Sequence, residues 1–154
     1  MIGPEDIRAP RVVSATREVA APASRIFELI ADPASHPRWD GNDNLAEATG
    51  AQRVRAVGEV FEMTLTGGAV RDNHVVEMEE GRLIAWRPAD PGREPAGHLW
   101  RWELEPIGPS LTRVTHTYDW TQLGDEKRLA RARATTQEKL RASLDRLAAL
   151  AESG

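Results

Sequence analysis

Alternating apolar and polar residues first appear in residues 12–19 (VVSATREV), and this pattern predicts a first β-strand. Pro22 then suits the first turn of a helix whose apolar face lies between residues 26 and 30. That helix has to end near residue 31, because Asp32 precedes a proline and is pushed out of helical geometry. The segment that follows, residues 33–41, contains a second proline and is expected to form at most one helical turn and a loop.

From residue 44 to residue 120 the pattern changes to short alternating runs separated by turn signals, which is typical of an antiparallel meander. Gly67-Gly68 favours a two-residue hairpin, and residues 79–81 (EEG) favour a three-residue hairpin. Residues 106–110 are expected to form a five-residue connection. Together with the first strand, these runs predict a seven-stranded sheet.

The three turns also predict which residues face each other across the sheet. They place His74 opposite both Phe61 and Trp86 on neighbouring strands, and Trp100 opposite His116. On this register the large apolar residues share one face. The opposite face, expected to meet water, contains Glu62, Thr64, Arg71, Asn73, Glu77, Arg87, Arg101, Glu103, Arg113, Thr115 and Asp119.

The last part of the chain predicts one long helix. Asp125 is a good N-cap, and nothing breaks a helix from there to about Ala151, which gives a length of about 40 Å. Its buried stripe is expected to be Leu129, Thr136, Leu140, Leu144, Leu147 and Ala151. Because Ala130, Ala132, Ala134, Thr135 and Thr136 in the first half are small, whereas the second half carries leucines, we expect the first half to cover a space that it does not fill.

Length and composition limit the class of protein. A chain of 154 residues with 40% hydrophobic and 29% charged residues fits one globular domain, expected at residues 12–154 after a flexible segment at residues 1–11. The formal net charge of −4 lacks the basic excess that nucleic-acid binding needs. No apolar run is long enough for a membrane span, and the N-terminal residues do not resemble a signal peptide, so a cytoplasmic location is expected. Cysteine is absent, which excludes disulfides and thiolate sites.

Three segments carry a family resemblance: residues 17–41 (REVAAPASRIFELIADPASHPRWDG), residues 75–87 (VVEMEEGRLIAWR) and residues 143–150 (SLDRLAAL). In these segments and in the order of its elements, the chain resembles the polyketide cyclase/dehydrase branch of the START-like, or SRPBCC, superfamily. The resemblance implies an α+β helix-grip fold, in which a curved seven-stranded antiparallel sheet surrounds a long C-terminal helix, with two short helices after the first strand. Gly67-Gly68 does not match the glycine-rich loop of the pollen-allergen relatives.

The resemblance also implies a pocket for a hydrophobic small molecule between the sheet and the long helix. No cofactor is implied. Carried onto this chain, the ligand-binding residues are Phe27, Trp39, Phe61, Met63, His74, Val76, Trp86, Trp100, Trp102, His116, Tyr118, Leu129, Thr136 and Leu140.

Several polar residues fall on the face that should be buried. They are Asp72, His74, His98, His116 and Tyr118. Because a buried polar group without a partner costs about 1–3 kcal/mol, these side chains either line a cavity as binding or acid/base groups, or satisfy one another in a closed core. A metal site is not expected, since two of the histidines stand two strand spacings, about 9–10 Å, apart.

Three functions remain open at this point. The first is binding of a polyketide- or lipid-like molecule, and the second is a cofactor-independent cyclase or dehydratase that uses the histidines, Tyr118 or Asp72 as acid and base. The third is a protein-interaction module of the co-chaperone type. A homodimer through Val75, Leu83 and Leu99 on the outer sheet face is a further possibility.

Overall fold

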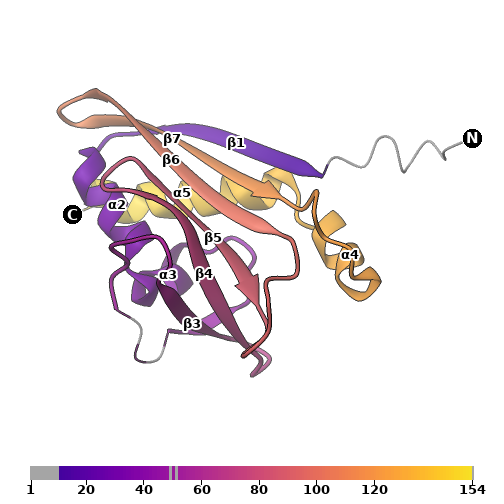
Figure 1. Ribbon diagram of the computed structural model, residues 1–154. Coiled ribbons are helices and arrows are strands. Elements are labelled where there is room, and N and C mark those ends of the chain that lie inside the picture. Colours follow the sequence, from indigo (N-terminus) through magenta and orange to yellow (C-terminus); the bar gives the residue numbers. More distant parts are fainter. Residues whose placement is uncertain (1–10, 49, 51, 154) are drawn as a thin grey trace, which may run out of the picture.

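The computed structural model describes residues 11–48, 50 and 52–153, and its sheet has the seven strands expected (Figure 1). The strands are β1 (Val12–Val19), β2 (Leu45–Glu47), β3 (Val60–Leu65), β4 (Val70–Glu79), β5 (Leu83–Ala89), β6 (Leu99–Gly108) and β7 (Leu111–Asp119). The helices are α2 (Ala23–Ala31), the 3₁₀ turn η1 (Pro33–Ser35), α3 (His36–Trp39), α4 (Glu126–Arg133) and α5 (Gln137–Ser153). All neighbouring strands are antiparallel, in the order β1-β7-β6-β5-β4-β3-β2. The helix-grip α+β fold is confirmed.

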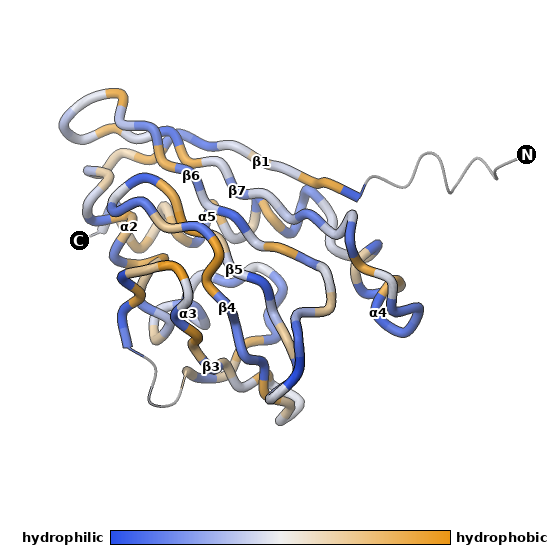
Figure 2. Tube along the Cα trace, in the orientation of Figure 1, coloured by the Kyte–Doolittle hydropathy of each residue, from blue (hydrophilic) through white to orange (hydrophobic). Residues whose placement is uncertain are grey.

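The helices are distributed unequally over one side of the sheet. Helix α5 packs on β1 and β7 and also contacts α2 and α3. Helix α4 lies at the end of the molecule away from α2 and α3 (Figure 1). The apolar face of α2 and the leucines of α5 form the packed core, with Phe27, Leu140 and Leu144 fully buried. Helix α4 is mainly hydrophilic and buries only Ala132 (Figure 2). The interior is therefore closely packed near α2 and less so toward α4.

The prediction of one uninterrupted C-terminal helix was wrong, because the chain breaks between α4 and α5. Asp125 caps α4 as expected, accepting the N–H of Lys127 at 3.0 Å. At the break, the Thr135 hydroxyl donates to the carbonyl of Arg131 at 3.1 Å, and the Thr136 hydroxyl accepts the N–H of Lys139 at 3.3 Å. The N–H of Thr135 turns to the carbonyl of Ala132 at 3.1 Å, so its hydroxyl satisfies the Arg131 carbonyl that the helix leaves free, and Thr136 caps the start of a new helix.

The register predicted for β3 and β4 was wrong by one residue. Gly68 has a φ of +93° and closes a three-residue loop, in which the N–H of Leu65 donates to the carbonyl of Ala69 at 2.7 Å. His74 therefore pairs with Val60, and Phe61 pairs with Asn73. A one-residue slip moves every side chain to the other face of a strand.

A β-bulge ends this exchange of faces within β4. Pairing with β5 shifts between Val75, which lies opposite Trp86, and Glu77, which lies opposite Ala85. His74 consequently pairs with Arg87 on the outer face, so the predicted pairing with Trp86 was wrong. Of the residues expected to meet water, Arg71 and Asn73 instead face inward.

Strands β6 and β7 pair two residues away from the predicted register, with Trp100 opposite Tyr118 and Trp102 opposite His116. The connection is a tight turn with a bulge between Pro106 and Gly108, rather than a five-residue loop. Because the shift is by two residues, the side chains predicted to face inward on both strands still do so.

Two of the three residues considered for a dimer contact on the outer sheet face are buried. Val75 and Leu99 are only 2% and 3% exposed, so neither offers a surface to a partner. None of the helices in the described part of the chain combines the length and the apolar composition needed to span a bilayer. The expected flexible segment, residues 1–11, lies outside the described residues except for Arg11 and stays a prediction.

Gly41 fixes the loop after α3 against α5. Its N–H donates to the Ser143 hydroxyl at 2.8 Å, and a Cβ at this position would lie 2.5 Å from the carbonyl oxygen of Lys139. We expect Gly41→Ala to lower the free energy of unfolding by about 1–3 kcal/mol, because the loop has to move away from the helix. Gly124→Ala is the control, since no atom lies near that position. Equal denaturant midpoints for the two variants would contradict the close packing described here.

Candidate ligand cavity

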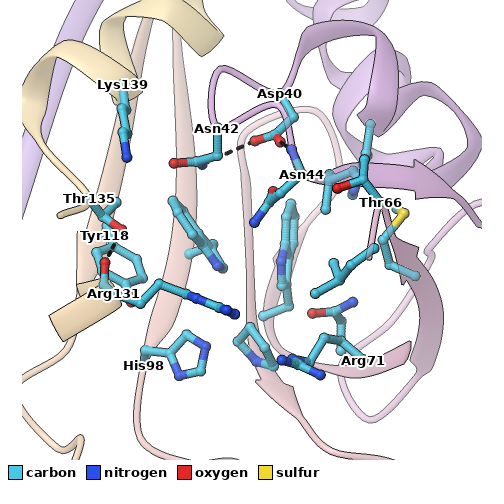
Figure 3. A pocket seen from close by; sticks show the side chains of 18 of the residues that line it. Asp40, Asn42, Asn44, Thr66, Arg71, His98, Tyr118, Arg131, Thr135 and Lys139 are labelled. Atoms are coloured by element: carbon cyan, nitrogen blue, oxygen red, sulfur yellow. Dashed lines mark hydrogen bonds between the residues drawn. The ribbon is translucent and has the colours of Figure 1, made fainter. Parts of the chain in front are cut away.

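A cavity of about 500 Å³ lies between the inner face of the sheet and the α3 and α4–α5 segments (Figure 3). Its apolar lining is mainly aromatic and includes Trp39, Phe61, Met63, Trp86, Trp100 and Trp102. Its polar lining includes Asp40, Asn42, Asn44, Arg71, Asn73, His98, His116, Tyr118, Arg131, Thr135 and Lys139. This volume is within the range of small-molecule sites in proteins.

His36 anchors the α3 side of the cavity. Its Nε2 lies 2.7 Å from the carbonyl oxygen of Ile30, and its ring stacks on Trp86 with centroids 5.1 Å apart and planes inclined by 19°. Burial lowers the pKa of His36 to about 4. The neutral ring therefore acts as a packing element, and its neighbour Trp39 is fixed by donating to the carbonyl of Leu29 at 2.9 Å.

His116 forms the floor of the cavity in a stack of three rings. Its centroid lies 3.7 Å from that of Trp102 and 5.5 Å from that of Trp100, with nearly parallel planes. Its Nδ1 lies 3.1 Å from the carbonyl of Arg101, an acceptor, so Nδ1 carries the proton. Burial lowers the pKa of His116 to about 3, and the ring is neutral at pH 7.

A second polar group lies where α4 meets the sheet. The Tyr118 hydroxyl shares a hydrogen bond with Thr135, and burial raises the pKa of Tyr118 to about 12 (Figure 3). His98 lies beside it, with ring centroids 6.0 Å apart. Burial first, and then the positive charges of nearby arginines such as Arg128, lower the pKa of His98 to about 4. At pH 7 this corner offers a protonated phenol and a neutral imidazole.

Among the described residues, Asp40 is the only carboxylate that lines the cavity. Its Oδ1 accepts from the Asn42 amide at 3.1 Å and its Oδ2 from the N–H of Asn44 at 3.3 Å. Burial raises the pKa of Asp40, and the hydrogen bonds oppose this shift. Its oxygens hold the loop between α3 and β2 together.

Eight of the fourteen residues expected to bind ligand line the cavity. They are Trp39, Phe61, Met63, Trp86, Trp100, Trp102, His116 and Tyr118. Of the acid/base candidates His98 lines it as well, whereas Asp72 does not.

The other six expected residues lie elsewhere. His74 and Val76, like Asp72, are turned away from the cavity by the loop and bulge of β4. Phe27 and Leu140 are fully buried in the packed core, beyond the cavity. The remaining two, Leu129 and Thr136, are displaced because the helix that was to present them is broken.

Sequence reasoning missed much of the polar lining. Arg71 and Asn73 were assigned to the outer face because the β4 register was wrong, and Arg131 was not among the residues expected to bind ligand. Asp40, Asn42 and Asn44 follow directly after Trp39, and this run of polar residues could have indicated a polar part of the cavity lining. In the described residues no cluster of three or more histidine or acidic side chains is arranged to hold a metal ion.

The buried histidines predict how stability depends on pH. Because the folded pKa values of His36 and His116 lie below the ordinary 6.5, the unfolded chain binds more protons as the pH falls below that value. We expect the free energy of unfolding to be level above about pH 7 and to fall below pH 6.5 by up to about 1.4 kcal/mol per pH unit for each histidine.

His116→Phe keeps a stacked ring and removes one of these groups. Urea denaturation at pH 7, 6 and 5 should give a shallower decline for this variant than for the unaltered protein. Identical slopes would show that His116 is not buried in its neutral form.

The chain has clear relatives among known proteins. The profile of the family described as "Polyketide cyclase / dehydrase and lipid transport" matches residues 10–152. The uncharacterised protein Rv0088 of Mycobacterium tuberculosis is 36% identical over 118 residues, which is 75% of this chain and 50% of that protein. The chain thus spans about half the length of the curated relatives it matches.

Solved structures share the fold at low sequence identity. The Zhui aromatase/cyclase from Streptomyces sp. R1128 gives a TM-score of 0.67 at 17% identity, over 92% of this chain and 93% of that one. A START superfamily protein from Mycobacterium smegmatis gives 0.64 at 19%, over 92% and 97%. The Aha1 dimer from Colwellia psychrerythraea gives 0.64 at 18%, over 92% and 96%. These structures show that the fold is shared, and the profile match over residues 10–152 shows that the chain belongs to the polyketide cyclase/dehydrase and lipid transport family.

Proposed function

We propose that this protein binds a hydrophobic small molecule, polyketide- or lipid-like, in the cavity between the sheet and the α4–α5 segment. The observation that carries the proposal is an aromatic wall around about 500 Å³ of space. Burial of apolar ligand surface is favourable by roughly 25 cal/mol per Å², so such a wall supplies the main binding energy. Membership of a family that includes lipid transport supports the same function.

The rigidity of the wall favours a ligand with rings or a fixed shape. Trp100 is held between Tyr118, at a centroid distance of 4.3 Å, and His116. Trp86 is held by His36 and by an edge contact with Phe61 at 5.3 Å. Side chains that are already ordered lose little conformational entropy when a ligand binds.

A cyclase or dehydratase reaction is the second candidate. It is favoured by one observation, namely that His98, Tyr118 and Thr135 bring an imidazole and two hydroxyls to one corner of the cavity. A general acid or base works best with a pKa near the operating pH, whereas the pKa of His98 is about 4 and that of Tyr118 about 12. Binding is therefore the better-supported function, and the fold shared with an aromatase/cyclase does not change that order.

The interaction-module hypothesis has weaker support. It rests on a fold shared with the Aha1 dimer at 18% identity. Binding another protein on the outer surface would not explain why the interior holds an aromatic-lined cavity.

Filling the mouth of the cavity tests the binding proposal. Ala134 lines the cavity between α4 and α5, whereas Ala130 lies one turn earlier on an exposed part of α4 and does not line it. We expect one molecule of the neutral fluorescent probe N-phenyl-1-naphthylamine to bind per chain. Ala134→Trp should weaken binding by about tenfold or more, because the indole takes up the space, and Ala130→Trp should leave it unchanged. Equal affinities for both variants would place the probe outside the cavity.

Catalysis is tested separately with a poly-β-keto thioester. If the protein only binds, cyclised product forms at the uncatalysed rate with the unaltered protein and with Tyr118→Phe alike. Turnover that Tyr118→Phe abolishes, with probe affinity unchanged, would establish the enzymatic alternative instead.

A further inference from the structure

Three cationic side chains from three different elements line the cavity. Arg71 comes from β4, Arg131 from α4 and Lys139 from α5. In Figure 3 the guanidinium groups of Arg71 and Arg131 point toward each other from opposite walls, and Lys139 points in from the α5 side. The chain as a whole has a net charge of −4, so this concentration of positive charge is local.

Little negative charge compensates these groups. Among the described residues, Arg131 and Lys139 form no ion pair with a carboxylate. Arg71 lies 3.4 Å from Asp90, but the same carboxylate makes a closer contact of 2.6 Å with Arg128. The cavity carboxylate, Asp40, is already held by Asn42 and Asn44.

A buried hydrogen-bond donor without a partner also favours a ligand that carries an acceptor. Trp102 is fully buried and lines the cavity, and its indole N–H, which can only donate, has no acceptor among the described residues. An unpaired buried donor carries a desolvation cost, which an acceptor on a ligand would remove. The cavity therefore offers an unpartnered indole N–H and more positive than negative charge, with Arg71, Arg131 and Lys139 against Asp40.

We propose that the ligand is an amphipathic organic acid, whose apolar body lies against the aromatic wall and whose carboxylate, sulfonate or phosphate lies between Arg71 and Arg131. The side chain of Arg71 is only 19% exposed, so its charge acts in a medium of low effective dielectric constant. A guanidinium group also matches an anionic oxygen pair with two parallel hydrogen bonds. This inference rests on the proposed function and deepens it by naming the ligand class.

Two probes with the same apolar body separate this inference from simple hydrophobic binding. 8-Anilinonaphthalene-1-sulfonate carries an anionic group, and N-phenyl-1-naphthylamine lacks it. We expect Arg131→Gln and, independently, Arg71→Gln to weaken binding of the sulfonate by about tenfold, while binding of the neutral probe stays within about twofold. Arg141→Gln removes an exposed charge of α5 that does not line the cavity and should change neither.

The outcomes are distinct. Retained neutral-probe binding with selective loss of the sulfonate supports the inference and shows that the variants are folded. If both probes bind the variants as well as the unaltered protein, the anion site is refuted and the hydrophobic cavity remains. If the neutral probe fails to bind the unaltered protein, the proposed function itself is overturned, and the inference with it.

Discussion

The contact on which the rest of the interior depends is the packing of the short helix α3 against the sheet through aromatic rings. His36 is fixed at one side by the carbonyl of Ile30 and stacks at the other on Trp86, while Trp39 makes an edge contact with Trp102 at 5.1 Å. Because these rings are held in place, they close the packed core on the α2 side. They also line the cavity, whose other side is formed by Arg131, Ala134 and Thr135.

The hollow end follows from the sequence of the C-terminal region. The paired threonines end α4 and begin α5, so large apolar side chains of a continuous helix do not cross this part of the sheet. Ala134 and Thr135 take their place at the edge of the cavity, with Arg131 one turn earlier. The interior therefore has an aromatic wall on the sheet and a polar, cationic wall on the helices, which suits an amphipathic ligand better than a purely apolar one.

The sequence predicted the order of elements, the seven strands and the aromatic face of β5, β6 and β7, because hydrophobic alternation and turn residues are local signals. It did not predict the inner face of β4. There, one left-handed glycine in the loop and one bulge exchanged His74 and Val76 for Asn73 and Val75, and both features depend on contacts with neighbouring strands. The helix break was missed because threonine is tolerated within helices, and only its hydrogen bonds in the folded chain show that it ends one.

The family relationship and the cavity together support the proposal that this chain holds a binding site for a hydrophobic small molecule. The most direct test is a crystal structure of the protein with N-phenyl-1-naphthylamine. We expect one ordered probe molecule between the aromatic wall and Thr135, within contact of Trp86 and Trp100. A probe bound only on the outer surface, or an interior in which Arg131 and the aromatic side chains have closed the cavity, would contradict it.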